Sequence, residues 1–250
     1  MDRTLVTRWL PTAVKRRLRP LIAPLAYAME RPRMRAFYGA IVGPGDLVFD
    51  IGAAEGFHAK VLAELGARVI CVEPQPYCLR VLERRFAGHP RVTIVPVGVG
   101  GETGEATLHI SRGDPEISTF GIEKWQSGRF AGFSWEDQVT VPMVTLDQLI
   151  DDHGLPALAK IDVEGTELQV LSGLSRALPW ISFEFTREFL DDTRRCLEHI
   201  ASHGSIVCNA TLFRRWQPML TQWVTPEVLL ERLDTESGDA LYGDIHARPG

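Results

Sequence analysis

The stretch Val48-Phe49-Asp50-Ile51-Gly52-Ala53-Ala54-Glu55-Gly56 decides the fold class of this 250-residue chain. An apolar run that ends in a glycine-bearing turn and leads into a helical pattern is typical of a buried parallel strand followed by a helix. Glycine tolerates positive φ and lets a ligand approach the backbone closely. The N–H groups at the start of the helix can face a carboxylate. We therefore expect a ligand site at residues 50–56.

The same alternation of strand and helix continues along the chain. Strands are predicted at 46–51, 68–72, 91–97, 157–162, 180–185 and 205–211, and helices at 56–65, 76–86, 166–178 and 188–202. A final short strand is expected at 244–247. This alternation predicts an α/β fold with a doubly wound, mostly parallel sheet, covered on both faces and ending in an antiparallel strand.

Two regions interrupt the alternation and define the domain organisation. Residues 1–40 look helical but contain several prolines, so we predict a basic helical N-terminal extension there and one domain at 41–250. Residues 98–145 form an insertion, in which a glycine-rich turn at 100–104 and an alternating stretch at 105–110 predict a hairpin. The polar, aromatic-dotted part at 111–138 is typical of a functional loop.

A carboxylate follows the second predicted strand, in Glu73-Pro74. It can accept hydrogen bonds from both hydroxyls of a ribose, each contributing about 1.5–3 kcal/mol. The glycine turn lacks the middle glycine of the dinucleotide fingerprint, which argues against NAD. The combination favours S-adenosylmethionine, although a glycine turn that merely packs and a Glu73 that caps a helix would also fit. The predicted donor-site residues are Asp50, Gly52, Ala53, Glu55, Gly56, Glu73 and Pro74.

Three segments together resemble the FkbM-type methyltransferase family: Val48-Phe49-Asp50-Ile51-Gly52-Ala53, Cys71-Val72-Glu73-Pro74 and Lys160-Ile161-Asp162-Val163-Glu164-Gly165-Thr166-Glu167. Ser118-Thr119-Phe120 and Val144-Thr145-Leu146-Asp147 are similar to landmarks between them. The resemblance covers roughly residues 38–190 and implies a class I methyltransferase (Rossmann-like) fold, S-adenosylmethionine as donor and usually O-methylation. Because the family acts on glycans, natural-product scaffolds and other hydroxylated molecules, it implies a small-molecule, glycan or glycolipid-like acceptor. Ala54 stands where the family often has Asn, which removes one side-chain contact.

Methyl transfer from a sulfonium is an in-line displacement, so the protein mainly aligns the reacting atoms. A neutral hydroxyl is a poor nucleophile, and a general base or a metal ion beside it helps. Asp162 ends the fourth parallel strand and is the first candidate for either role. Glu184 ends the next strand, so Asp162 and Glu184 could together hold Mg²⁺.

Three further residues near these strand ends have competing interpretations. Glu164 is a catalytic candidate, but an acid there also suits the start of a helix. His58, just after the glycine turn, could act as a base or have a structural role. Lys160 lies within an apolar strand, where an ammonium needs a partner, so we expect a structural ion pair rather than catalysis.

Charge is distributed unevenly along the chain. Residues 1–35 hold nine of the 27 Lys and Arg but only two of the 32 Asp and Glu. This basic arm could be a cap over the donor cleft or a membrane-surface contact. Nucleic acid is disfavoured because the acidic body would repel phosphate. Without a disulfide framework, signal peptide or transmembrane segment, we expect a cytoplasmic protein that is membrane-peripheral only if the arm binds lipid.

These features together predict an S-adenosylmethionine-dependent O-methyltransferase. Aromatic residues in loop 111–138 suit a sugar or ring-bearing acceptor, and they equally fit the anchors of a long flap. Two alternatives stay open: a non-catalytic S-adenosylmethionine-binding module and an RNA methyltransferase. The acids predicted beside the donor pocket argue against the first, and the acidic body argues against the second.

Overall fold

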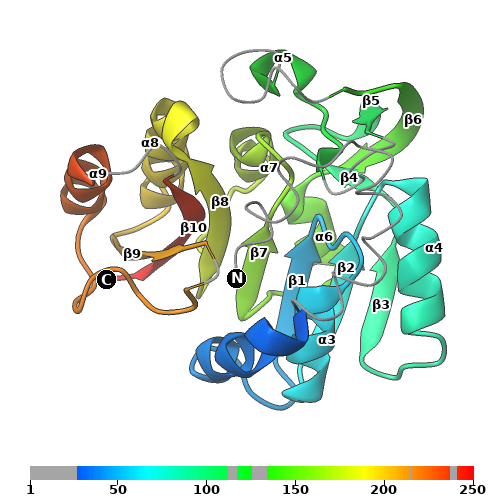
Figure 1. The fold of residues 1–250 in the computed structure, drawn as a ribbon, viewed down its shortest axis with the longest axis horizontal. Helices are drawn as coiled ribbons and strands as arrows, with labels where there is room; N and C mark the ends of the chain where they lie inside the picture. The colour runs from blue at the N-terminus through cyan, green and yellow to red at the C-terminus, as the bar shows by residue number, and fades with distance from the viewer. Residues whose placement is uncertain (1–26, 112–116, 126–133, 214, 237–240) are drawn as a thin grey trace.

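A seven-stranded sheet forms the centre of the computed structural model, which describes residues 27–111, 117–125, 134–213, 215–236 and 241–250 (Figure 1). The strand order is β3-β2-β1-β7-β8-β10-β9. The strands are β1 (Leu47–Ile51), β2 (Arg68–Val72), β3 (Val92–Val95), β7 (Leu158–Ile161), β8 (Ile181–Thr186), β9 (Ile206–Leu212) and β10 (Tyr242–Pro249). β10 is antiparallel to both of its neighbours, whereas the pairs from β3 to β8 are parallel. The predicted fold class, a class I Rossmann-like methyltransferase sheet, is confirmed.

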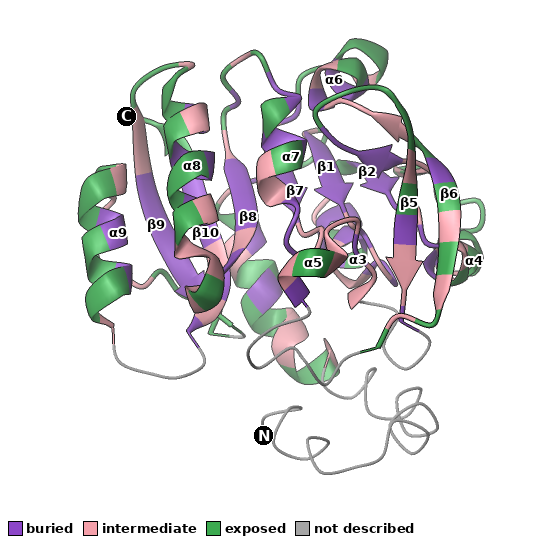
Figure 2. Cartoon of the chain, turned by 90° about the horizontal axis from the view of Figure 1, so that it is seen from above, coloured by how far each residue is buried: buried purple, intermediate pink, exposed green. Residues whose placement is uncertain are grey.

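Helices cover both faces of this sheet, and Figure 2 shows the buried strands between helices whose outer surfaces are exposed. One face packs against helix 27–39, α3 (Phe57–Glu64) and α4 (Pro76–Arg85). The other packs against α6 (Leu146–His153), α7 (Glu167–Ser172), α8 (Leu190–Ala201) and α9 (Pro226–Thr235). Because β1 lies between two helical layers, all five of its residues are buried, which explains why all of them except Asp50 are apolar.

The predicted hairpin within the insertion is wrong. β4 (Gly98–Val99), β5 (Gly104–Ile110) and β6 (Asp137–Val144) form a separate sheet in the order β4-β6-β5. β4 and β5 therefore both pair with β6 instead of with each other. Pro142 hides β6 in the sequence, because proline cannot donate a hydrogen bond to a neighbouring strand. In the structure β4 pairs only with Met143 and Val144, so Pro142 does not interrupt that pairing.

Several boundaries also differ from the predictions. The helix expected to reach residue 178 ends at Ser172, and its C-cap, Gly173, packs closely against the backbone of Gly100. α6 and α9 were not predicted. Most of the basic arm, residues 1–26, lies outside the described residues, as do the loop segments 112–116 and 126–133.

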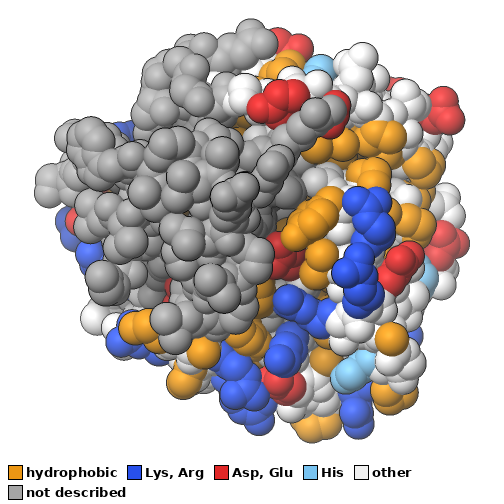
Figure 3. Space-filling model, turned by 45° about the vertical axis from the view of Figure 1, so that its right-hand side comes forward, with side chains coloured by type: hydrophobic (Ala, Val, Ile, Leu, Met, Phe, Trp, Pro, Cys, Tyr) orange, Lys and Arg blue, Asp and Glu red, His pale blue; other side chains and the backbone are white. Residues whose placement is uncertain are grey.

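All four cysteines are free and buried, so no disulfide bond constrains the fold. Within the described ranges, no helix is both long and apolar enough to cross a bilayer. On the side of the molecule that carries α4, Figure 3 shows Lys and Arg side chains among hydrophobic ones, and α4 itself exposes Arg80 and Arg84.

Candidate functional site

The carboxyl ends of β1 and β2 bring the glycine turn and Glu73 together. The two strands pair in register, with Ile51 opposite Val72. Glu73 accepts a hydrogen bond from the Ala54 N–H at its Oε2 (2.8 Å) and from the Gln75 N–H at its Oε1 (2.8 Å). Its side chain is buried, and burial raises its pKa to about 7. Two backbone segments thus hold the carboxylate, and each oxygen keeps a second lone pair for a ligand.

A cleft of about 490 Å³ lies at these strand ends, where open α/β sheets bind their ligands. Gly52, Glu73 and Pro74 line one side of it, and Asp162 and Glu164 line another. Its apolar lining comes from the end of β2, the β3–β4 region, β5 and the 118–120 segment: Val72, Val97, Val99, Leu108 and Phe120. Three of the seven predicted donor-site residues therefore border this cleft, and Ala54 joins them.

The other predicted donor-site residues, Asp50, Ala53, Glu55 and Gly56, are not among the residues that line the cleft. Asp50 is buried, and neither of its oxygens has a hydrogen-bond partner among the described residues. Burial raises its pKa to about 6, while Lys160 and the nearby Ala59 N–H lower it. Gly56 has a φ of 74°, and a Cβ there would lie 2.6 Å from both Leu82 and Phe86. Its structural role is to let α3 pack closely on α4.

His58 is likewise not among the residues that line the cleft. Its Nδ1 lies 2.6 Å from the Tyr38 hydroxyl, and its ring packs against Trp216. Burial, and then the Lys160 charge, keep the pKa of His58 well below its ordinary value. The structure thus gives this side chain a place in the packing of helix 27–39 against α3.

Gly52 joins the glycine turn to the turn that follows β7. Its φ is 77°, and a Cβ on it would lie 1.8 Å from the carbonyl oxygen of Asp162. The Asp162 N–H donates to the Ile51 carbonyl at 2.9 Å. The close approach that requires glycine here is therefore between two segments of the protein itself, in addition to any approach by a ligand.

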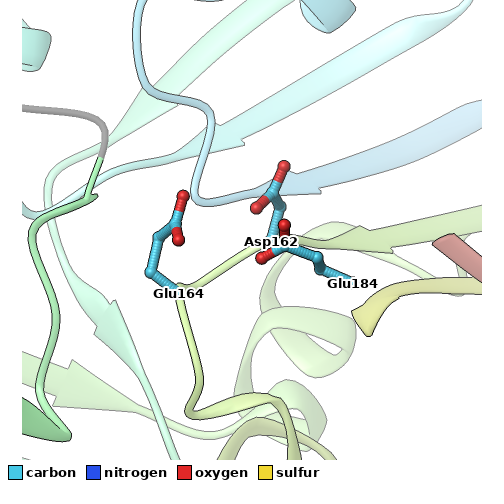
Figure 4. Close-up of side chains that lie close together, drawn as sticks. All are labelled: Asp162, Glu164 and Glu184. Carbon is cyan, nitrogen blue, oxygen red and sulfur yellow. The ribbon is translucent and has the colours of Figure 1, made fainter. Parts of the chain in front are cut away.

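Three carboxylates meet at the ends of β7 and β8. One carboxylate oxygen from each of Asp162, Glu164 and Glu184 lies within 4.8 Å of the others. Figure 4 shows Asp162 and Glu184 converging beside the turn that carries Glu164. Burial, followed by repulsion from Glu164 and Asp162, raises the pKa of Glu184 well above its ordinary value. The structure thus brings together the residues predicted to act as base or metal ligands.

Lys160 forms the ion pair that the sequence predicts. Its Nζ lies 2.7 Å from Oδ2 of Asp162. The Lys160 side chain is 2% exposed and that of Asp162 is 32% exposed. The aspartate is therefore accessible from the cleft, whereas the lysine lies behind it.

A short segment, residues 119–125, holds the turn that follows Asp162. Thr119 and the indole N–H of Trp125, at the end of α5 (Ile122–Trp125), donate to the Glu164 carbonyl at 2.8 and 2.9 Å. The Lys124 ammonium donates to the Gly165 carbonyl at 2.8 Å. Glu164 has a φ of 57°, a conformation that costs a non-glycine residue about 1–3 kcal/mol. The three hydrogen bonds stabilise this turn. The Ser118-Thr119-Phe120 landmark was the available signal for Thr119. The aromatic pattern of loop 111–138 was the signal for Trp125, and no pattern predicted the contact of Lys124.

A protein-family model and a curated relative match this sequence. The sequence model of the methyltransferase FkbM domain matches residues 50–207. The hexuronic acid methyltransferase AglP of Haloferax volcanii is 28% identical over 142 residues, which are 55% of this chain and 54% of the relative. The chain thus spans about half the length of that curated relative.

Two solved structures are among those to which this chain is similar. The FkbM methyltransferase from Methylobacillus flagellatus is 21% identical, with 65% of this chain and 38% of that chain covered and a TM-score of 0.45. Fibrillarin from Aeropyrum pernix, solved with natively bound S-adenosyl-L-methionine, is 11% identical, with 83% and 68% covered and a TM-score of 0.44. Since the family model matches more than half of the sequence, the chain belongs to the FkbM methyltransferase domain family.

Proposed function

We propose that the protein is an S-adenosylmethionine-dependent O-methyltransferase that methylates a hydroxyl group of a small-molecule, glycan or glycolipid-like acceptor. The observation that supports this most is that Glu73 and Asp162 line one cleft. Glu73 suits a ribose, and Asp162 suits the deprotonation of an acceptor. The curated relative acts on a hexuronic acid, which makes sugars the first class of acceptor to test.

The residues present fit such a donor. Glu73 is a buried carboxylate whose remaining lone pairs can accept from the two ribose hydroxyls. The apolar side chains of Val72, Val97 and Leu108 suit the faces of an adenine ring. Bound there, S-adenosylmethionine would supply a methyl group already activated by its sulfonium.

Asp162 is the proposed general base. Its ion pair with Lys160 uses Oδ2, and Oδ1 has no hydrogen bond within the described part of the chain. An acceptor hydroxyl beside Oδ1 would lose its proton to this carboxylate as its oxygen becomes methylated. A base of this kind typically contributes about 10²- to 10⁴-fold in rate.

A metal-assisted version is the second candidate, because three carboxylates converge at Asp162, Glu164 and Glu184. Oxygen ligands of this kind suit Mg²⁺. The base without metal remains our first proposal, since Lys160 already balances the Asp162 charge. Turnover that survives exhaustive chelation would exclude the metal version, and loss of turnover that only a divalent cation restores would support it.

The decisive experiment is an acceptor screen with a methyl-labelled donor, covering neutral sugars, uronic acids, glycolipids and hydroxylated metabolites. With the best acceptor, Asp162→Asn should lower kcat by about 10²-fold or more and leave donor affinity nearly unchanged. Asp234→Asn on the exposed surface of α9 is the matched control. Full turnover by Asp162→Asn would disprove the base assignment. Failure to form S-adenosylhomocysteine with every acceptor would favour a non-catalytic binding module.

A further inference from the structure

A row of buried polar side chains crosses the sheet. The strand registers place Asp50 beside Lys160, Lys160 beside Ser182 and Ser182 beside His246, and each of the four is at most 3% exposed. Val48 and Leu158, two residues earlier on β1 and β7, pack in the core beneath α3. Because side chains alternate along a strand, this row faces α3 and helix 27–39. Lys160 is the one Lys or Arg in it.

The buried ammonium of Lys160 is paired with one carboxylate. A buried ammonium is costly unless it is paired. Asp162, Asp244 and Asp50 all interact electrostatically with Lys160. Of these three, only Asp162 makes a direct contact, at 2.7 Å. The hydrogen bond of Lys160 is therefore directed at the carboxylate beside the cleft.

The surroundings of Asp162 show why such a contact matters. Its backbone is held by the hydrogen bond to Ile51 and by the close approach of Gly52. Its side chain, in contrast, lies next to Glu164 and Glu184, which repel it. The hydrogen bond from Lys160 is the attractive contact that sets the orientation of the carboxylate.

We propose that Lys160 is a positioning residue that holds the Asp162 carboxylate where it can accept the proton of the acceptor hydroxyl. At 2% exposure, Lys160 does not reach the acceptor, so it acts only through Asp162. This inference rests on the proposed function, because it assigns a partner to the proposed base. A purely structural lysine would instead affect the fold and leave the Asp162-dependent part of turnover unchanged.

A double-mutant cycle tests the proposal, with kcat and the acceptor KM measured for Lys160→Met, Asp162→Asn and the double variant. Lys160→Met should lower kcat by about tenfold or more and change KM by less than about threefold. The double variant should be no slower than Asp162→Asn alone, because two residues that act as one unit give non-additive losses. Losses that multiply, or a Lys160→Met variant with normal kcat, would overturn the inference. Arg31→Met is the control, since it removes an ion pair of the same 2.7 Å length, to Glu64, on the surface.

A second genetic background and an NMR measurement keep this test decisive. If Lys160→Met unfolds, the cycle is repeated in an Asp50→Asn background, which removes one buried charge of each sign. Without any acceptor, the ¹⁵N-lysine NMR signal of the Lys160 ammonium should shift in Asp162→Asn and remain in place in Asp234→Asn. An unshifted signal would contradict the proposal. Normal turnover in Asp162→Asn would defeat the proposed base itself, whereas impaired Asp162→Asn with unimpaired Lys160→Met would defeat only the role of Lys160.

Discussion

The two strands that flank β1 end in carboxylates held in different ways. After β2, Glu73 is held by the N–H groups of Ala54 and Gln75 and is 5% exposed. After β7, Asp162 is held by the side chain of Lys160 and is 32% exposed. The donor edge, residues 50–56 and 73–75, is thus built mainly from backbone. In the acidic edge, formed by Asp162, Glu164 and Glu184, the carboxylates are instead oriented by contacts with side chains. Substitutions should therefore affect the two edges differently.

Gly52 connects the two edges, so Gly52→Ala should have the largest effect. The added Cβ would overlap the Asp162 carbonyl and require a positive φ, which we expect to lower the free energy of unfolding by about 3 kcal/mol or more. Thermal or urea unfolding would measure this. Gly45→Ala is the matched control, because Gly45 also has a positive φ, 89°, but no atom lies within 4 Å of the added Cβ. Equal losses for the two variants would show that the contact between the edges is unimportant.

Glu73→Ala should affect the donor edge alone. Loss of the ribose acceptor should weaken S-adenosylmethionine binding by about 10- to 100-fold, since hydrogen bonds to charged groups contribute about 1.5–3 kcal/mol. Isothermal calorimetry gives the dissociation constant directly. Glu83→Gln on the exposed surface of α4 is the control. Donor affinity that survives Glu73→Ala would place the donor elsewhere.

The pH dependence of donor binding should follow from the same carboxylate. Burial raises the pKa of Glu73 to about 7, so the free protein holds a proton there below that pH. The ionised form accepts from both ribose hydroxyls, and affinity should therefore increase with pH, by about tenfold from pH 6 to pH 8. Calorimetry at several pH values tests this, and Glu73→Gln should abolish the dependence. Because burial also raises the pKa of Glu167 to about 7, Glu167→Gln must retain it if the assignment is correct.

Trp125→Phe should have the smallest effect, confined to the acidic edge. It removes the indole N–H that donates to the Glu164 carbonyl and keeps a ring against Phe189. One hydrogen bond contributes about 1 kcal/mol, so turnover should decrease by about fivefold while donor affinity is unchanged. Trp180→Phe is the matched control, because it makes the same change at an indole N–H that has no hydrogen-bond partner among the described residues. Identical turnover in the two variants would contradict this role of Trp125.

Sequence reasoning succeeded where one local pattern was enough. It placed β1, the glycine turn, Glu73 and an ion pair of Lys160, whose partner Asp162 only the structure identified, because strand periodicity and the cost of a buried charge are local constraints. It was wrong about the hairpin, because β4 and β5 both pair with β6. It placed Trp125 among the aromatic residues of loop 111–138 and gave Lys124 no partner, whereas both reach the Glu164–Gly165 turn from about 40 residues away in the chain. No periodic pattern or motif marks this contact.

The sequence by itself determined the doubly wound sheet, the family and the carboxylates that end successive strands, because parallel strands bring their carboxyl ends to one edge. Only the tertiary structure decided what those residues contact. It excluded Asp50, Glu55 and His58 from the lining of the described cleft and showed that Gly52 is required by the Asp162 carbonyl. The reason is physical: the positions of strands and helices and the alternation of side chains follow from local chemistry, whereas orientation across a cleft depends on packing between segments distant in the chain.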